Sequence, residues 1–178
     1  MNYADYKFRA ILKQYKKPVY RQALRILGDV QDAEELTQDV FLNVYYGLEL
    51  LREEERIDAW IYRITANACL SRRRKAAERY VSLEEAELDG QIMAPNPGPN
   101  PEEEYLQQEE RIQLLRHVSV LPRKEAIAIT LCHYEDKSYN EISSIMQVPP
   151  GTVAALLYRG RLHLHALLVS EKKKETDK

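Results

Sequence analysis

The sequence predicts an all-α fold: two small helical domains joined by a flexible, acidic, proline-rich linker, with a helix-turn-helix in the C-terminal domain. Three observations support this fold class. Apolar residues recur at helical spacing on both sides of the middle of the chain, and no segment alternates as a strand does. The middle holds four of the eight prolines within residues 95–101, a stretch that cannot form a helix or a paired strand. Near the C-terminus, two short apolar stripes flank a tight turn.

The composition is that of a folded protein without a membrane segment. The chain has 178 residues, enough for one average domain or two small ones, and 44% are hydrophobic. No window approaches the ~18–20 apolar residues that a membrane span needs, and the N-terminus does not read as a secretory signal. The two cysteines offer neither a disulfide framework nor a paired metal site. We expect a cytoplasmic protein with no membrane insertion, metal or other cofactor.

Charge is segregated along the chain, although the net charge is only -2. Residues 1–80 carry 15 Lys and Arg against 12 Asp and Glu, whereas residues 81–110 carry nine acids and no base. Residues 111–178 are again basic, with 11 bases against seven acids. We interpret the acidic middle as a linker, the alternative being a solvated loop without a role. The predicted divisions are an N-terminal domain (1–80), the linker (81–104), a C-terminal domain (105–170) and a basic tail (171–178).

Four helices are predicted before the linker. The first rests on apolar residues near 3.6-residue spacing, among them Phe8, Ile11 and Tyr15. Pro18 is expected to open a second helix, which Gly28 ends. Asp32 is expected to cap the third helix, and Asp58 the fourth, which runs over residues 59–74. Four helices of these lengths can bury one small core.

The C-terminal domain is predicted to contain helices at 105–120, 124–133, 139–146 and from 150 to about 170, with a break at Leu121-Pro122. Residues 138–162 have the pattern of a helix-turn-helix: Ser138 caps its first helix, and Pro150 suits the first turn of the second. Such a unit places its second helix in the DNA major groove. An ordinary helical hairpin is the alternative, but Arg159 and Arg161 favour DNA.

Two further motifs lie in the N-terminal domain. Residues 32–41 combine an acidic, amide-bearing face with apolar residues on another face. Residues 59–67 are aromatic and apolar and are followed by four consecutive bases at 72–75, a combination suited to stacking on a single nucleic-acid strand. Alternatively, Trp60 belongs to the core and the bases face solvent. No glycine-rich phosphate loop or nucleophile elbow is present, so catalysis is not expected.

In this order and spacing, the motifs resemble the extracytoplasmic-function (ECF) sigma factors of bacterial RNA polymerase. The resemblance rests on DAEELTQDVF at 32–41, AWIYRITAN at 59–67, Leu121-Pro122, SYNEIS at 138–143 and PGTV at 150–153. It implies two helical domains, no enzymatic activity without core polymerase, and three partners: core RNA polymerase, promoter DNA and an anti-sigma factor. It also implies that the linker threads toward the active-site cleft of polymerase.

The resemblance also implies roles for individual residues. Polymerase binding is expected at Asp32, Glu34, Glu35, Leu36, Gln38, Asp39 and Phe41. Contacts to the -10 element, including an unpaired base captured near residues 51–58, are expected from Arg56, Trp60, Tyr62, Arg63, Asn67, Arg72, Arg73 and Arg74. Contacts to the -35 element are expected from Ser138, Tyr139, Pro150, Gly151, Thr152, Ala155, Arg159 and Arg161.

The chain departs from the family pattern where DNA is expected. Ala154, Ala155 and Leu156 stand where relatives usually carry Lys, Ser and Arg, and Ser71 replaces the usual aspartate. Residues 53–55 are glutamates in the loop expected to capture a base. Two other functions therefore stay open: a helix-turn-helix regulator that binds duplex DNA without polymerase, and a helical interaction protein with a decayed DNA surface.

Overall fold

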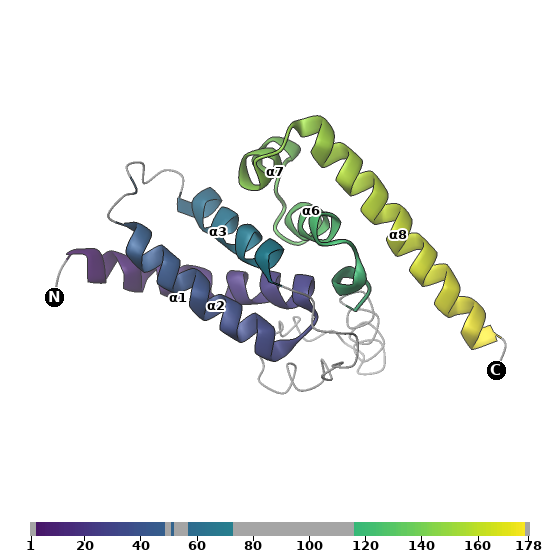
Figure 1. The fold of residues 1–178 in the computed structure, drawn as a ribbon, viewed down its shortest axis with the longest axis horizontal. Coiled ribbons are helices and arrows are strands. Elements are labelled where there is room, and N and C mark those ends of the chain that lie inside the picture. The colour runs from purple at the N-terminus through teal and green to yellow at the C-terminus, as the bar shows by residue number, and fades with distance from the viewer. Residues whose placement is uncertain (1–2, 49–50, 52–56, 73–115, 177–178) are drawn as a thin grey trace, which may run out of the picture.

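The computed structural model describes residues 3–48, 51, 57–72 and 116–176 (Figure 1). The elements in these ranges are all helices, as predicted. They are α1 (Tyr3–Leu27), α2 (Val30–Gly47), α3 (Ile57–Ser71), α6 (Arg123–His133), α7 (Tyr139–Met146) and α8 (Pro150–Thr176). The predicted linker at 81–104 and most of the helix predicted at 105–120 lie outside the described residues; residues 116–120 are helical.

The prediction that Pro18 opens a second helix is wrong, because α1 continues through it. A proline inside a helix cannot donate the backbone hydrogen bond to the residue four positions earlier. Burial of apolar side chains before and after Pro18 offsets the cost of this missing hydrogen bond. Ile11, Val19, Ala23 and Ile26 follow one helical face and are at most 5% exposed. A break at Pro18 would take this stripe out of phase with the core.

The predicted caps at Asp32 and Asp58 are also wrong. Gly28 ends α1 in the left-handed region, with φ 71° and an N–H bond of 2.8 Å to the carbonyl of Leu24. A Cβ there would also lie 2.6 Å from the side chain of Ser119. Asp29 then caps α2 by accepting a bond from the N–H of Asp32. Asp58 lies inside the first turn of α3, which begins at Ile57.

The predicted helix-turn-helix is present. Ser138 and Glu141 form a capping box at the start of α7, and Gln147 ends that helix with a φ of 54°. The Ser143 hydroxyl donates to the carbonyl of Val148 at 2.6 Å, which fixes the turn. α8 begins at Pro150, as predicted, but continues to Thr176 rather than ending near residue 170.

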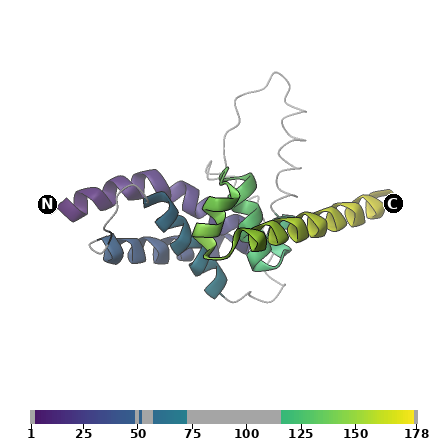
Figure 2. The same ribbon diagram turned by 90° about the horizontal axis from the view of Figure 1, so that it is seen from above.

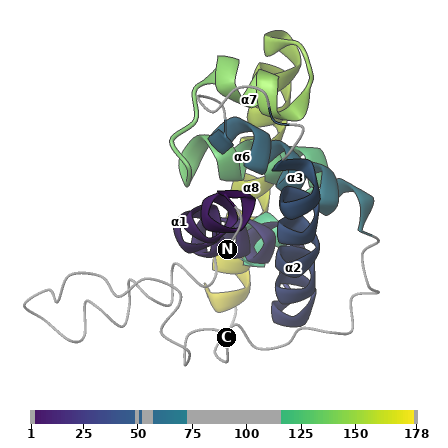
Figure 3. The same ribbon diagram turned by 90° about the vertical axis from the view of Figure 1, so that its left-hand side faces the viewer.

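The helices form two units that pack against each other. α1, α2 and α3 make the first unit, and α6, α7 and α8 the second. α6 and α7 lie on α3, and α6 also contacts α1 (Figure 3). The buried side chains of both units form one hydrophobic core. α8 packs on α6 and α7, and its C-terminal part extends beyond the other helices (Figure 2).

Candidate functional site

The acidic side of α2 is exposed, but its predicted apolar anchors are not. The exposed predicted contacts are Glu34, Glu35, Gln38 and Asp39. Asp32 is only 8% exposed. Leu36 and Phe41 lie in the core at 1% and 5% exposure, and the Phe41 ring meets Phe8 edge-on at 6.5 Å. In this arrangement neither is available to a partner, because the helical period turns them away from the acids.

Two other apolar side chains share the acidic face. Leu42 and Tyr46 are 55% and 74% exposed, and they follow Asp39 at spacings of three and seven residues. Residues at these spacings lie along one side of a helix. Both were missing from the residues predicted for polymerase binding, although this spacing from Asp39 was a signal that could have identified them.

Arg72, directly after α3, pairs with the acids at one end of this face. One of its terminal nitrogens lies 3.0 Å from the Asp32 carbonyl oxygen, 3.3 Å from the Asp32 carboxylate and 3.4 Å from Glu35. The other lies 3.2 Å from the carboxylate of Asp39. Arg72, which was predicted to contact the -10 element, is therefore paired with three acids. Two of these acids, Asp32 and Asp39, lie about two helical turns apart on α2.

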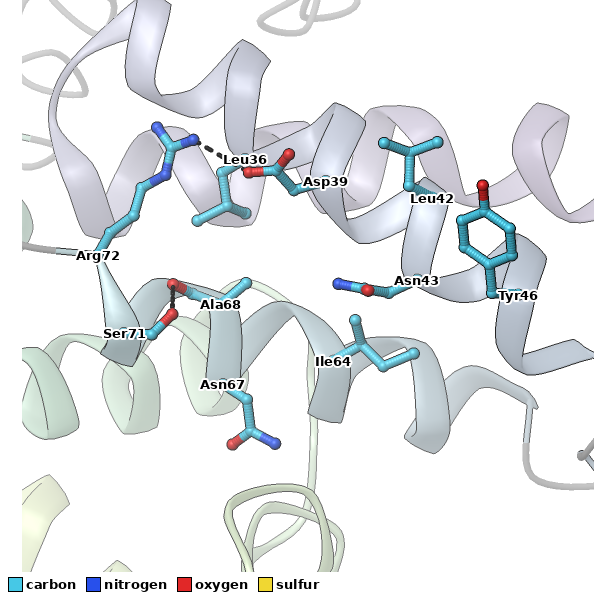
Figure 4. Close-up of a pocket in the computed structure, with 10 residues that line it drawn as sticks. All are labelled: Leu36, Asp39, Leu42, Asn43, Tyr46, Ile64, Asn67, Ala68, Ser71 and Arg72. Atoms are coloured by element: carbon cyan, nitrogen blue, oxygen red, sulfur yellow. Dashed lines mark hydrogen bonds and ion pairs between the residues drawn. The ribbon is translucent and has the colours of Figure 1, made fainter.

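A groove of about 770 Å³ runs between α2 and α3 (Figure 4). Arg72 and Asp39 form its charged end, and Leu42 and Tyr46 flank its apolar part. Its lining residues are Leu36, Asp39, Leu42, Asn43 and Tyr46 from α2, and Ile64, Asn67, Ala68, Ser71 and Arg72 from α3 and its end. Its walls therefore present cationic, anionic, amide and apolar groups side by side.

The aromatic residues of α3 are less accessible than predicted. Trp60 is half-buried against α2, where a Cβ on Gly47 would lie 2.7 Å from its ring. This favours the alternative that Trp60 belongs to the core. Tyr62 is 7% exposed, and its hydroxyl donates to Glu135 at 2.8 Å. Burial, followed by the hydrogen bond to Glu135, raises the pKa of Tyr62 well above its usual range.

Of the remaining residues predicted to contact the -10 element, Asn67 is exposed and Arg63 is half-buried with its Nε covered. Arg56, Arg73 and Arg74 lie outside the described residues. The structure thus brings Asn67 and Arg72 to one groove and turns Tyr62 toward the second unit.

The residues predicted to contact the -35 element are exposed on the second unit. They are Ser138 and Tyr139 at the start of α7, and Pro150, Gly151, Thr152, Ala155, Arg159 and Arg161 on α8. The expectation that Leu156 faces DNA is wrong, since it is 3% exposed and lies with Val153 and Leu157 in the core. The helical period explains this, because residues three and four apart share the inner face of α8.

Both arginines of α8 that are predicted to contact the -35 element have protein partners. Glu125 of α6 is 5% exposed and lies 3.4 Å from Arg159 and 2.7 Å from His163. Arg161 lies 3.4 Å from a ring nitrogen of His133. Burial and the charge of Arg161 lower the pKa of His133, so this histidine is neutral at neutral pH. The arginines remain exposed on their outer sides.

A partly buried carboxylate joins the two units. Glu135, in the turn after α6, accepts the Tyr62 hydrogen bond and lies 3.2 Å from Arg25 of α1. The Arg25 guanidinium also stacks 4.2 Å from the ring centre of Tyr134. Burial lowers the pKa of Arg25, and the charge of Glu135 opposes this shift. These contacts were not predictable from the sequence, because a charged turn has the pattern of a solvated segment.

Three more contacts cross the same boundary. Lys137 lies 3.2 Å from the carboxylate of Asp58 and 5.0 Å from the ring centre of Tyr62. Arg123 donates to the carbonyl of Cys69 at 2.6 Å. Burial raises the pKa of the Cys69 thiol to about 12, so this cysteine stays protonated and unreactive.

Among the described residues, no helix is long and apolar enough to cross a membrane. The same part of the chain contains no group of three or more His, Cys, Asp or Glu residues placed to hold a metal ion.

Two protein-family models match the chain. Sigma-70 region 2 matches residues 11–79, which include α2 and α3, and sigma-70 region 4 matches residues 111–164, which include the helix-turn-helix. The ECF RNA polymerase sigma factor SigW of Bacillus subtilis is 31% identical over 160 residues, covering 86% of this chain and 84% of SigW.

Two solved structures share the fold. One is the sigma factor RpoE of Bartonella quintana in complex with the anti-sigma factor NepR, with a TM-score of 0.65 and 19% identity over 91% of this chain and 96% of RpoE. The other is CnrH in complex with the cytosolic domain of CnrY, with a TM-score of 0.61 and 18% identity over 92% of this chain and 88% of the matched chain. Since the SigW match spans most of both proteins, the chain belongs to the ECF sigma factors, non-enzymatic subunits that direct RNA polymerase to promoters.

Proposed function

We propose that core polymerase docks on the groove between α2 and α3 and on the acidic face beside it. The observation that carries this proposal is the composition of the groove: exposed Glu35 and Asp39 lie beside exposed Leu42 and Tyr46. Acids can pair with basic side chains of a partner and set the association rate, while the apolar residues supply a desolvated centre. Leu36 supports this surface from beneath, in the core.

The -10 strand is proposed to lie along α3 and the bases that follow it, with Asn67 and Arg72 among its contacts. Tyr62 can join them only if the second unit moves away, because Glu135 covers its hydroxyl in the present arrangement. A contact between Tyr62 and the promoter therefore requires the two units to separate. Interactions with the displaced strand must offset the few kcal/mol that unpairing a base costs.

The -35 element is proposed to meet the N-terminal turns of α8. Gly151 and Thr152 are exposed there, and Ala154 and Ala155 leave the adjoining surface short of cations. Arg159 and Arg161 supply phosphate contacts from their exposed sides. Binding by this unit alone should therefore be weak and should depend on the rest of the polymerase complex.

An anti-sigma factor is a further proposed partner. The two solved structures of similar fold are complexes with an anti-sigma factor, NepR, and with the cytosolic domain of CnrY. Such a partner would bind the closed arrangement and keep Tyr62 covered.

Because its polymerase and promoter partners occupy the bacterial cytoplasm, we propose that location for this chain, without membrane insertion. The linker at 81–104 and the other predicted divisions also remain proposals.

Charge reversal tests the docking surface. Glu35→Lys combined with Asp39→Lys should weaken the affinity for core polymerase roughly tenfold or more, because it replaces attraction with repulsion at an exposed rim. Fluorescence titration of labelled full-length chain with purified core measures this. Asn140→Lys with Ser144→Lys adds positive charge to exposed positions of α7 and is the control. Unchanged affinity of the first variant, with unchanged helicity, would exclude this face as the docking surface.

A further inference from the structure

Arg72 lies where two proposed sites meet. It is the first of four consecutive bases at 72–75 that are proposed to lie beside promoter DNA. Its guanidinium nevertheless contacts Asp32, Glu35 and Asp39, the acids proposed to meet polymerase, at 3.2–3.4 Å. One side chain cannot hold a DNA phosphate and these three carboxylates at the same time, so Arg72 can serve only one of the two sites at once.

The position of Arg72 allows it to move. α3 ends at Ser71, and the backbone N–H of Arg72 is bonded to the carbonyl of Ala68 at 3.2 Å. The side chain starts from the end of the helix rather than from a packed helical face. It is 22% exposed, while the carboxylates of Glu35 and Asp39 are 50% and 61% exposed. An incoming cation can therefore reach these acids before Arg72 has left.

The charges of this cluster also allow Arg72 to be exchanged for a cation from a partner. Glu35 and Asp39 stay largely exposed to solvent while they pair with Arg72, and Glu34 is exposed beside them. The cluster therefore still attracts cations from a partner. The pairs with Glu35 and Asp39 are individually weak, because solvent screens them and long side chains lose freedom in forming them. A better-placed cation can therefore compete with Arg72 for these two acids, and it must also compensate Asp32, whose side chain is only 11% exposed.

We propose that Arg72 is an internal counter-ion of the docking groove. In the free sigma factor it shields the acidic end of the groove. On docking it is exchanged for a basic side chain of core polymerase, and its released guanidinium binds the promoter backbone. This inference rests on the proposed docking of polymerase at α2. By linkage, the binding of polymerase and of promoter DNA then favour each other through one residue.

The first test measures the affinity of the full-length chain for core polymerase. Arg72→Gln removes the competitor and should strengthen core binding roughly threefold to tenfold, the range of a typical coupling or exposed ion pair. Arg72→Lys keeps the charge but loses the planar fork that spans the acids, and it should give a smaller gain in the same direction. Lys16→Gln, at an exposed position of α1, removes the same charge elsewhere and should cause no gain.

The neutral pair Glu35→Gln and Asp39→Asn separates this inference from the docking proposal. If that pair binds core as well as the natural chain does, docking at α2 fails, and the exchange fails with it. If the pair weakens binding but Arg72→Gln and Arg72→Lys bind core no more tightly than the natural chain, docking stands and the exchange is overturned. The exchange is supported if Arg72→Gln strengthens binding only while both acids are present.

The second test measures promoter binding by the polymerase complex at saturating core, over a range of salt concentrations. Released Arg72 should contribute one phosphate contact, so Arg72→Gln should flatten the log–log salt slope by about 0.7, the value for a single strand. An unchanged slope overturns the transfer of Arg72 to DNA. Thermal unfolding of each variant, followed by circular dichroism, verifies that the helices remain folded.

Discussion

At the scale of single residues, Leu156 shows how the helical period decides which side chains meet a partner. The family pattern places it beside Ala154 and Ala155 as a DNA contact, yet it is 3% exposed. Val153, Leu157 and Gly160 lie on the same inner face, and a Cβ on Gly160 would come within 2.9 Å of Ile129. The three- and four-residue spacing of these positions already indicated that Leu156 lies on the inner face of α8. Of the two positions where relatives usually carry a cation, only Ala154 is exposed, so it is the position that lacks a cation toward DNA.

Two substitutions on α8 should consequently affect different properties. Leu156→Arg should destabilise the chain by roughly 3–5 kcal/mol, because it removes a buried apolar side chain and buries a charge. Ala154→Lys should leave the stability unchanged and steepen the salt slope of binding to -35 duplex by about 0.9. Urea unfolding and salt-dependent titration of the full-length chain measure these effects. If Ala154→Lys left both affinity and slope unaltered, this face of α8 would not contact DNA.

At the scale of the helix, local signals predicted some boundaries and missed others. Ser138 followed by Glu141 is a complete capping signature, and α7 begins where it predicts. Asp29 and Asp32, three residues apart, could each have capped α2. Asp29 is the cap, because Gly28, in the left-handed region, ends α1 directly before it. The prediction from Pro18 was wrong because burial against other helices keeps α1 continuous, and a local sequence signal carries no information about that burial. The helices were thus predictable, while their ends depended on packing.

The capping box of α7 should make stability depend on pH. Bonds from the Ser138 hydroxyl and backbone N–H lower the pKa of Glu141 below its ordinary value of 4.5. A carboxylate with a lowered pKa in the folded state adds stability above its ordinary pKa and loses it as pH falls through the folded value. Ser138→Ala should cost about 1 kcal/mol at pH 7. The deficit of Glu141→Gln should shrink below pH 4.5.

Urea unfolding at several pH values measures both variants. Ser144→Ala, at an exposed position of the same helix, is the control and should change neither the stability nor its dependence on pH. A constant deficit of Glu141→Gln from pH 7 to pH 3.5 would show that the ionised carboxylate does not stabilise the start of α7.

At the scale of the whole molecule, the arrangement of the two units was not predictable. Periodicity and motifs identified each unit because they are local in sequence. The contacts between the units join residues 73 and 110 positions apart, as in Tyr62–Glu135 and Arg25–Glu135, and no periodic pattern relates them. The same holds for the site: Asp39 and Asn67 were predicted for two separate functions, but only the fold places them along one groove.

The closed arrangement should depend on Glu135. Glu135→Leu removes the acceptor of Tyr62 and leaves Arg25, whose side chain is 15% exposed, without that carboxylate between the units. An uncompensated, largely buried cation costs about 1–3 kcal/mol, and separation of the units relieves this cost by returning Arg25 to water. We therefore expect a larger radius of gyration by small-angle X-ray scattering and stronger binding of free chain to a single-stranded -10 oligonucleotide, since Tyr62 becomes accessible. Asp136→Asn, at the exposed neighbouring position, removes a carboxylate but keeps a residue type that tolerates the φ of 49° there, and it should leave both unchanged. If Glu135→Leu kept the compact radius and the same oligonucleotide affinity, Glu135 would not hold the units together, and the core contacts between α3, α6 and α7 would be sufficient to keep the chain closed.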